Sequence, residues 1–205
     1  MRRLWLASSS PRRMQLLEAA GFDALRVPAP VDDDKLAEAV AGVEATCLAR
    51  AWFKAMAARA MLRERQGGSP EEPNGILLAA DTLCALGGRL LGKPTDSAEA
   101  EVMIRTLAGE THKTITGVAL LDLANDRRAL WCDAASVRVG RLEDSQVSEY
   151  VTSNQWQGKS GGYNLADRIE AGWPIDYDGD PATVMGLPMK RLAPQLHELL
   201  QETAT

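Results

Sequence analysis

The chain has 205 residues, of which 45% are hydrophobic and 25% are charged, and its formal net charge is -5 at pH 7. This length and apolar content suffice for one substantial core, so we expect a single domain over residues 1–205. The negative charge gives no general attraction to nucleic acid or to an anionic membrane, and no apolar run approaches the roughly 20 residues of a membrane span. We therefore expect a cytoplasmic protein with no nucleic-acid or membrane partner.

The three cysteines, Cys47, Cys84 and Cys132, are odd in number, widely spaced and flanked by apolar residues. This pattern predicts buried free thiols in a reducing compartment rather than a disulfide framework or a zinc site.

The first 66 residues predict two strands and two or three helices. Residues 2–8 form a short apolar run typical of a buried strand, and "PRRMQLLEAAG" has a proline in its first turn and a glycine at its end, which indicates a helix. A second short strand is expected in residues 24–30. The Ala-rich stretch from 35 to 66 predicts one long helix, or two helices with a break at Gly42.

The rest of the chain mixes strand and helix patterns. "ILLAAD" predicts a buried strand that ends at an acid, and "TLCALGGRLLG" predicts two short strands joined at a Gly-Gly turn. A helix from Thr95 or Asp96 to Gly109 precedes two long strands, and further helices are expected at 143–153 and 190–201, with irregular or hairpin-like structure at 158–188. The expected fold is α/β with a mixed sheet.

The first candidate site is the turn "LASSSPRR" between the first strand and the first helix. Free backbone N–H groups and the helix dipole favour an anion there, hydroxyls of Ser8, Ser9 and Ser10 could donate to it, and Arg12 and Arg13 could pair with it. In the alternative interpretation Ser10 caps the helix and both arginines face solvent.

The second candidate is Asp81, which follows a predicted buried strand in "LLAADT". Open α/β sheets bind ligands at the carboxyl ends of their strands, so Asp81 could hold a divalent metal or take a proton from water. A turn-capping role is the alternative, and the strand-like "TLCAL" that follows argues against it.

Other charged residues fit a phosphate site less specifically. Lys54 lies in an apolar helical stretch, where a solvated edge position is the alternative, and Lys93 lies between a predicted hairpin and a proline. The acidic run of residues 32–34 would suit Mg²⁺, although such a run in a loop is also commonly just solvated.

Six segments, "LASSSPRR", "ARAWFKA", "AADT", "LLGKP", "AGETHKTITGVAL" and "GKSGGYN", occur in an order and spacing that resembles the Maf family of nucleoside triphosphate pyrophosphatases. The resemblance covers Leu4 to about Leu192. It implies an elongated mixed β-sheet flanked by helices, like that of inosine triphosphate pyrophosphatases, with a cleft for the nucleotide. It also implies cleavage between the α- and β-phosphates with Mg²⁺ or Mn²⁺, and a homodimer.

The same resemblance implies residue roles. Ser8 and Arg13 would bind the phosphate chain, and Lys54 and Lys93 would neutralise it. Asp81 would be the general base. Asp33 aligns best with the family's metal-binding glutamate, and together with Asp81 it would hold the metal; whether Asp81 acts as base or chiefly as metal ligand stays open.

Substrate preference is also implied by resemblance. Arg12 and Thr82 match members that act on dTTP and UTP, whereas members that act on 7-methyl-GTP tend to have an aromatic residue and a glutamine there. A glutamine is expected after the "GGY" element, but Ala166 occupies that position. The extra acids and Trp173 in this segment indicate a remodelled base pocket or subunit contact.

We therefore expect a metal-dependent pyrophosphatase for dTTP, UTP or modified pyrimidine nucleotides. The alternative is a nucleotide-binding regulatory protein of cell division with little or no turnover, which the lost glutamine would suit. The presence of Asp81, Lys54 and Lys93 together favours the enzyme, because a protein that only binds needs no base.

Overall fold

The computed structural model describes residues 2–31, 42–65 and 74–201. In chain order the elements are β1 (Leu4–Ala7), α1 (Pro11–Ala19), β2 (Ala24–Arg26), α2 (Val43–Arg65), β3 (Ile76–Leu86), β4 (Arg89–Leu91), α3 (Ser97–Leu107), β5 (Thr111–Asp122), β6 (Arg128–Val139), α4 (Asp144–Thr152), the 3₁₀ turn η1 (Ser160–Gly162), α5 (Leu165–Glu170), β7 (Ile175–Asp178), α6 (Pro181–Met185) and α7 (Met189–Gln201).

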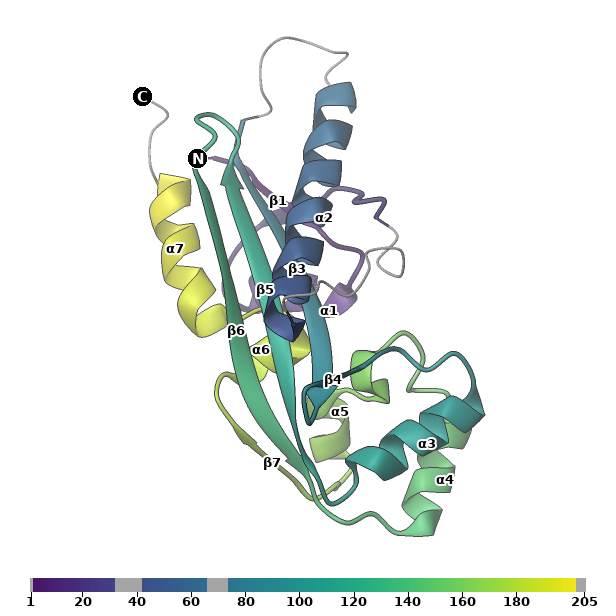
Figure 1. Cartoon of the computed structure of the whole chain (residues 1–205). Coiled ribbons are helices and arrows are strands. Elements are labelled where there is room, and N and C mark those ends of the chain that lie inside the picture. Colours follow the sequence, from purple (N-terminus) through teal and green to yellow (C-terminus); the bar gives the residue numbers. More distant parts are fainter. Residues whose placement is uncertain (1, 32–41, 66–73, 202–205) are drawn as a thin grey trace.

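The strands form one seven-stranded sheet with the order β2-β1-β3-β5-β6-β7, and β4 pairs with β3 beside this path. β1 pairs in parallel with β2 and β3, whereas β3, β5, β6 and β7 pair antiparallel in turn. The long strands β3, β5 and β6 extend the sheet in one direction (Figure 1). The structure thus confirms the expected α/β fold with an elongated mixed sheet flanked by helices.

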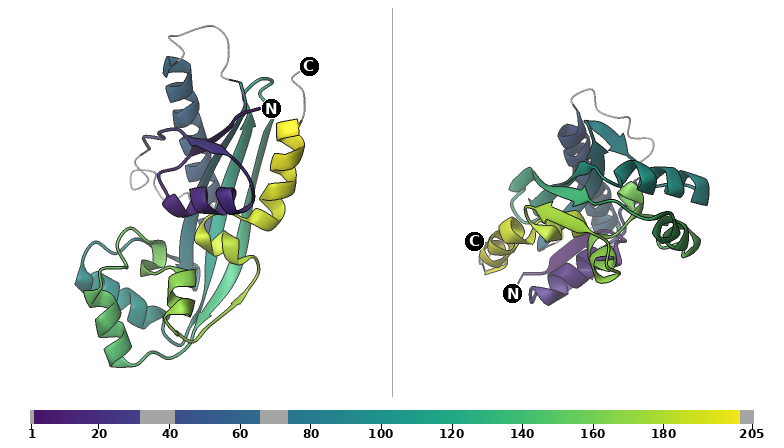
Figure 2. Two further views of the ribbon diagram at one scale, coloured as in Figure 1. Left: turned by 180° about the vertical axis from the view of Figure 1, so that it is seen from behind. Right: turned by 90° about the horizontal axis from the view of Figure 1, so that it is seen from below.

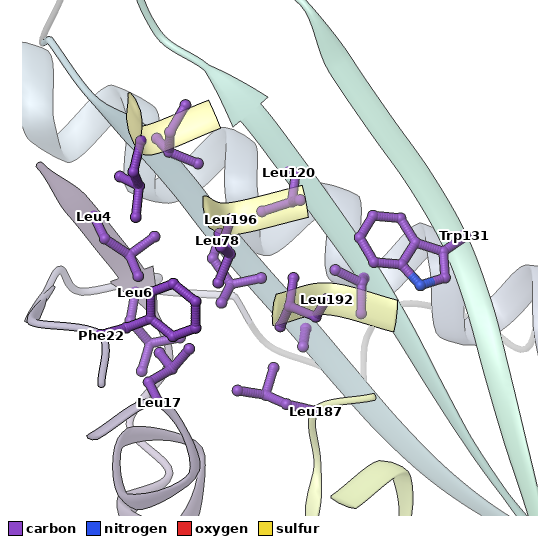
Figure 3. Packing of buried hydrophobic residues seen from close by; sticks show 14 residues of the cluster. Leu4, Leu6, Leu17, Phe22, Leu78, Leu120, Trp131, Leu187, Leu192 and Leu196 are labelled. Carbon is purple, nitrogen blue, oxygen red and sulfur yellow. The ribbon is translucent and has the colours of Figure 1, made fainter. Parts of the chain in front are cut away.

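Helices cover both faces of the upper part of the sheet. α2 packs on one face, and α1, α6 and α7 lie on the other (Figures 1 and 2). On the second face, Leu192 and Leu196 of α7 meet Leu78 and Leu120 of the sheet in the largest core cluster (Figure 3). Residues four apart lie on the same side of a helix, so these leucines form one apolar stripe along α7, and this stripe packs on the sheet.

The α2 face depends on small residues. Ala51, Ala55 and Ala58 of α2 are fully buried against β1, β3 and β5. A Cβ atom on Gly117 of β5 would lie 2.8 Å from the carbonyl carbon of Cys47. Only glycine at that position therefore lets α2 approach the sheet this closely.

A separate cluster fills the lower end of the molecule. It joins α3, α4 and α5 to the ends of β6 and β7, and its largest members are aromatic. Trp173 is buried there, 5.0 Å from the ring centroid of Tyr150 and 6.5 Å from that of Tyr163. Its indole thus belongs to the core.

The structure corrects two sequence expectations. β3 runs without interruption through Asp81, so the acid lies in mid-strand rather than at a strand end, and its backbone pairs with Gly117. Residues 158–188 contain four short elements, whose ends are marked by local caps such as Asp180 before α6 and the left-handed Gly186 after it. Residues 35–41 of the expected Ala-rich helix lie outside the described residues.

Two further expectations concern the cysteines and membranes. All three cysteines are free thiols, as predicted; Cys47 and Cys84 are buried, but Cys132 is only partly buried. Among the helices that the structure describes, none is both long and apolar enough to span a membrane.

Acidification is expected to destabilise this fold through His112 of β5. The ring is 1% exposed, its Nε2 lies 2.8 Å from the Tyr163 hydroxyl, and its Nδ1 has no hydrogen-bond partner among the described residues. Burial lowers the pKa of His112 to about 4 from an ordinary value of 6.5. Between these values the unfolded chain binds the proton more readily than the folded one, so stability is lost as the pH falls, by about 3 kcal/mol near pH 4.

Urea unfolding of the wild type and His112→Gln at pH 7, 5.5 and 4.5 tests this expectation. Glutamine keeps a hydrogen-bonding group for Tyr163 but cannot take up the proton. The variant should lose less unfolding free energy on acidification than the wild type, and equal losses in the two proteins would refute a role for His112.

Candidate active site

The turn between β1 and α1 is organised around Ser8. Its Oγ accepts a hydrogen bond from the backbone N–H of Ser10 (3.2 Å) and another from Nη1 of Arg13 (3.0 Å). Within the described residues the Ser10 side chain caps no helix amide. Ser10 thus occupies the N-cap position of α1, as the alternative interpretation expected, but its side chain makes no capping hydrogen bond in the described part of the chain.

Arg13 is held by three separate parts of the chain. Its side chain donates from Nε to the carbonyl oxygen of Gly186 (2.9 Å), from Nη1 to Ser8 and from Nη2 to Oγ1 of Thr82 (3.0 Å). The residue is only 8% exposed, so the alternative in which it faces solvent is wrong. Because each of the three nitrogen atoms of this planar guanidinium donates a hydrogen bond to the protein, its orientation is set before any anion binds.

The hydroxyl chain behind Arg13 reaches across the sheet. Thr82 Oγ1 lies 2.9 Å from Thr116 Oγ1 on β5, and Thr116 donates to the carbonyl oxygen of Thr183 on α6 (2.7 Å). The position of the Arg13 guanidinium is thus linked to β3, β5 and α6.

Asp81 forms a buried ion pair with Lys54. Its Oδ1 lies 2.6 Å from Nζ of Lys54, and the two side chains are 8% and 13% exposed. Two turns before Lys54 on α2, the Cys47 thiol donates to the carbonyl oxygen of Asp81 (3.2 Å) and accepts from the N–H of Gly117 (3.0 Å). These contacts fix α2 against β3 at the acid.

The second carboxylate oxygen of Asp81, Oδ2, is buried and has no hydrogen-bond partner among the described residues. Buried polar atoms in native proteins nearly always have a partner, and leaving one unpaired costs about 1–3 kcal/mol. Asp81 also lines a cavity. An oxygen in this state is suited to receive water, a metal ion or a ligand there.

The cavity has a volume of about 1220 Å³, which is ample for a nucleotide. Its described lining contains seven basic and two acidic residues: Arg12, Arg13, Arg26, Lys54, Arg65, Lys93 and Lys159 against Asp81 and Asp167. In a chain whose net charge is -5, this is a local concentration of positive charge. The cavity is therefore suited to a polyanion.

Another wall of the cavity comes from residues 157–167, which include the start of η1 and part of α5. Ser160 ties this wall to the sheet, because its Oγ accepts from the N–H of Cys84 (3.2 Å) and donates to the carbonyl oxygen of Leu91 (3.0 Å). Nζ of Lys159 lies 3.5 Å from Oδ2 of Asp167. The pKa of Lys159 is lowered, mainly because its side chain is partly buried. The negative charge of Asp167 raises this pKa, and the positive charge of Arg12 lowers it further.

Comparison with known proteins decides the family. A model of the Maf-like protein family matches residues 3–199. The chain belongs to the Maf family. It is 38% identical over 189 residues to the dTTP/UTP pyrophosphatase of Caulobacter vibrioides, covering 91% of this chain and 90% of that protein. It is 37% identical over 192 residues to the dTTP/UTP pyrophosphatase of Salinibacter ruber, covering 92% of this chain and 87% of that protein. The dTTP/UTP pyrophosphatase of Pyrococcus furiosus is 32% identical over 189 residues, covering 92% of this chain and 91% of that protein.

The structure brings most of the residues that the Maf motifs single out to one cavity. Seven of them line it: Ser8, Arg12, Arg13, Lys54, Asp81, Thr82 and Lys93. Asp33, expected to hold a metal, lies outside the described residues. Ala166, expected to affect specificity, is exposed on α5 and does not line the cavity in the described part of the chain, whereas its neighbour Asp167 does.

The sequence also contained signals that were not used to assign roles. Lys159 belongs to the Maf motif "GKSGGYN", so its place in the cavity could have been proposed from the motif alone. Thr116 and Thr183 carry no comparable local signal, because the contacts they make in this network join residues 34 and 67 positions apart.

The Asp81 carboxylate fits a divalent ion shared with a bound nucleotide. Among the described residues no group of three or more His, Cys, Asp or Glu side chains could hold a metal by itself. Mg²⁺, however, is usually held by only one or two carboxylates, with substrate phosphates and water as the other ligands. Oδ2 of Asp81, which has no hydrogen-bond partner in the described part of the chain and lies in a cavity large enough for a nucleotide, meets this requirement.

Proposed function

We propose that this Maf-family protein hydrolyses dTTP and UTP to the nucleoside monophosphate and pyrophosphate, with Mg²⁺ or Mn²⁺. The observation that carries the proposal is the buried Asp81 carboxylate in a cavity rich in basic residues: one oxygen contacts Lys54, and the other has no hydrogen-bond partner within residues 2–31, 42–65 and 74–201. The names of the relatives at 32–38% identity support the choice of substrates.

The triphosphate would lie along the basic side of the cavity. Arg13 and the first-turn N–H groups of α1 would hold phosphate oxygens, because fixed donors cost no rearrangement when charge develops. Lys93, exposed beyond β4, and Lys54 would add positive charge on the other side. Thr82 has its hydroxyl engaged with Arg13 and Thr116, so its effect on specificity would act through the position of Arg13.

Asp81 would take the proton from the attacking water at Oδ2, while Lys54 keeps Oδ1 in place. The water oxygen forms a bond to the α-phosphorus. The bond from this phosphorus to the oxygen that bridges the α- and β-phosphates breaks, and its electron pair leaves with pyrophosphate. A divalent ion held by Asp81, and by Asp33 on the family resemblance, would offset the charge of the phosphates.

A nucleotide panel tests this function. Purified protein is assayed for pyrophosphate release from the common ribo- and deoxyribonucleoside triphosphates with Mg²⁺, with Mn²⁺ and with EDTA. We expect release from dTTP and UTP with a metal and none with EDTA. No release from any triphosphate would contradict the proposal, and tight binding without turnover would favour the regulatory alternative.

The family resemblance also leads us to propose a homodimer in the cytoplasm. A dimer mass in light scattering would support the first part of this proposal, and fluorescence of a tagged chain in cells would test the second.

A further inference from the structure

The residue that follows the expected glutamine position faces the nucleotide cavity. Ala166 points its methyl group to solvent, and its backbone N–H donates to Oδ1 of Asn164, which caps α5 (3.0 Å). Leu165 is buried in the lower core and fixes the rotation of the helix. Asp167, one residue further on, therefore brings a carboxylate to the wall where a glutamine amide was expected.

Asp167 and Lys159 present an acceptor and a donor side by side. Their charged atoms are 3.5 Å apart, and the side chains are 45% and 17% exposed, so the carboxylate is accessible from the cavity. The hydroxyl of neighbouring Ser160 hydrogen-bonds to Cys84 of β3 and to Leu91. These two hydrogen bonds hold the segment that carries Lys159.

The charges indicate which part of a nucleotide meets this wall. The ion pair of Asp167 and Lys159 carries no net charge, so it suits a neutral part of the nucleotide, whereas the Arg13 guanidinium suits the phosphates. Thymine and uracil carry an N3–H donor between two carbonyl oxygens. Asp167 can accept from N3–H, and Lys159 can donate to the adjacent carbonyl oxygen. Cytosine has an unprotonated N3, which would face the carboxylate without a proton between them.

We propose that Asp167, positioned by its ion pair with Lys159, recognises the N3–H of thymine or uracil and is a specificity-determining residue of this chain. The inference rests on the proposed function for its substrates. In this chain, the carboxylate of Asp167 would take the role that the family resemblance gives to a glutamine at the position of Ala166.

The test compares dTTP with N3-methyl-dTTP, which lacks the proton in question. Wild type should prefer dTTP by about 10- to 100-fold in kcat/KM, as expected for a hydrogen bond to a charged group. Asp167→Ala should abolish that preference mainly by losing activity on dTTP. Glu170→Ala is the matched control, because Glu170 is an exposed acid on the same helix outside the cavity lining, and it should keep the preference.

A second readout separates base recognition from general damage. Inhibition by inorganic tripolyphosphate, which has no base, should be the same in the wild type and Asp167→Ala. An unchanged ratio of dTTP to N3-methyl-dTTP in Asp167→Ala would overturn the inference. So would a change confined to the ratio of UTP to dUTP, which would place Asp167 at the ribose.

Failure of the proposed function would be seen separately, as a wild type that releases pyrophosphate from no nucleotide. Equilibrium binding of α,β-methylene dTTP and its N3-methyl form then replaces turnover as the readout. A preference for the first analogue that Asp167→Ala abolishes would still support the inference, and equal binding of the two by wild type would overturn it.

Discussion

Replacing Asp81 with asparagine is expected to lower kcat for dTTP by about 10³-fold, within the range for loss of a general base. Asparagine has nearly the same shape, so it preserves the packing of β3 against α2. It cannot accept a proton at the position of Oδ2, and it offers a metal ion only a neutral oxygen. The measurement is steady-state release of pyrophosphate at saturating nucleotide and metal.

Loss of the ion pair with Lys54 could by itself weaken the fold, because removing one partner of a buried pair can cost about 3–5 kcal/mol. Asp122→Asn is the matched control, because Asp122 is a buried acid paired with Arg2 and does not line the cavity in the described part of the chain. We expect kcat within about 2-fold of wild type for this control. A folded Asp81→Asn protein that keeps a tenth or more of the wild-type kcat would rule out Asp81 as the base.

Arg13→Lys is expected to lower kcat/KM for dTTP by about 100-fold although the positive charge is kept. The Arg13 guanidinium contacts Gly186, Ser8 and Thr82 at once, and a single ammonium group cannot replace these contacts and also grip a phosphate. Both KM and kcat should change, because the phosphate chain would lose its fixed orientation as well as affinity.

Arg2→Lys tests whether any buried arginine gives the same result. Arg2 has a buried side chain paired with Asp122, and it is not among the described residues that line the cavity. Its substitution should alter the unfolding free energy but not kcat/KM. Equal losses of activity in Arg2→Lys and Arg13→Lys would mean that Arg13 acts through stability alone.

Local patterns predicted the fold well where one signal dominated. The Pro-to-Gly span predicted α1, the N-cap candidates Thr95 and Asp96 predicted the start of α3, and two long strand-like runs predicted β5 and β6. β3 was divided wrongly at Asp81, because a charge inside an apolar run looks like an end. In the structure, the charge is tolerated in mid-strand because Lys54 from α2 compensates it.

The site residues divide in the same way. Ser8, Arg13 and Asp81 stood out through their local sequence, and Lys54 and Lys93 through the family resemblance. The contacts of Arg13 with Thr82 and Gly186 span 69 and 173 positions, so only the tertiary fold reveals them. Whether residue 166 or 167 faces the cavity depends on the rotation of α5, which changes by about 100° per residue and is fixed by buried Leu165.

The most direct test of the central claim is identification of the products of a single turnover of dTTP with Mg²⁺ or Mn²⁺. The proposed chemistry predicts dTMP and pyrophosphate in equal amounts from the wild type, no inorganic phosphate, and neither product from Asp81→Asn on the same timescale. Formation of dTDP and inorganic phosphate, or recovery of intact bound dTTP from the wild type, would contradict it.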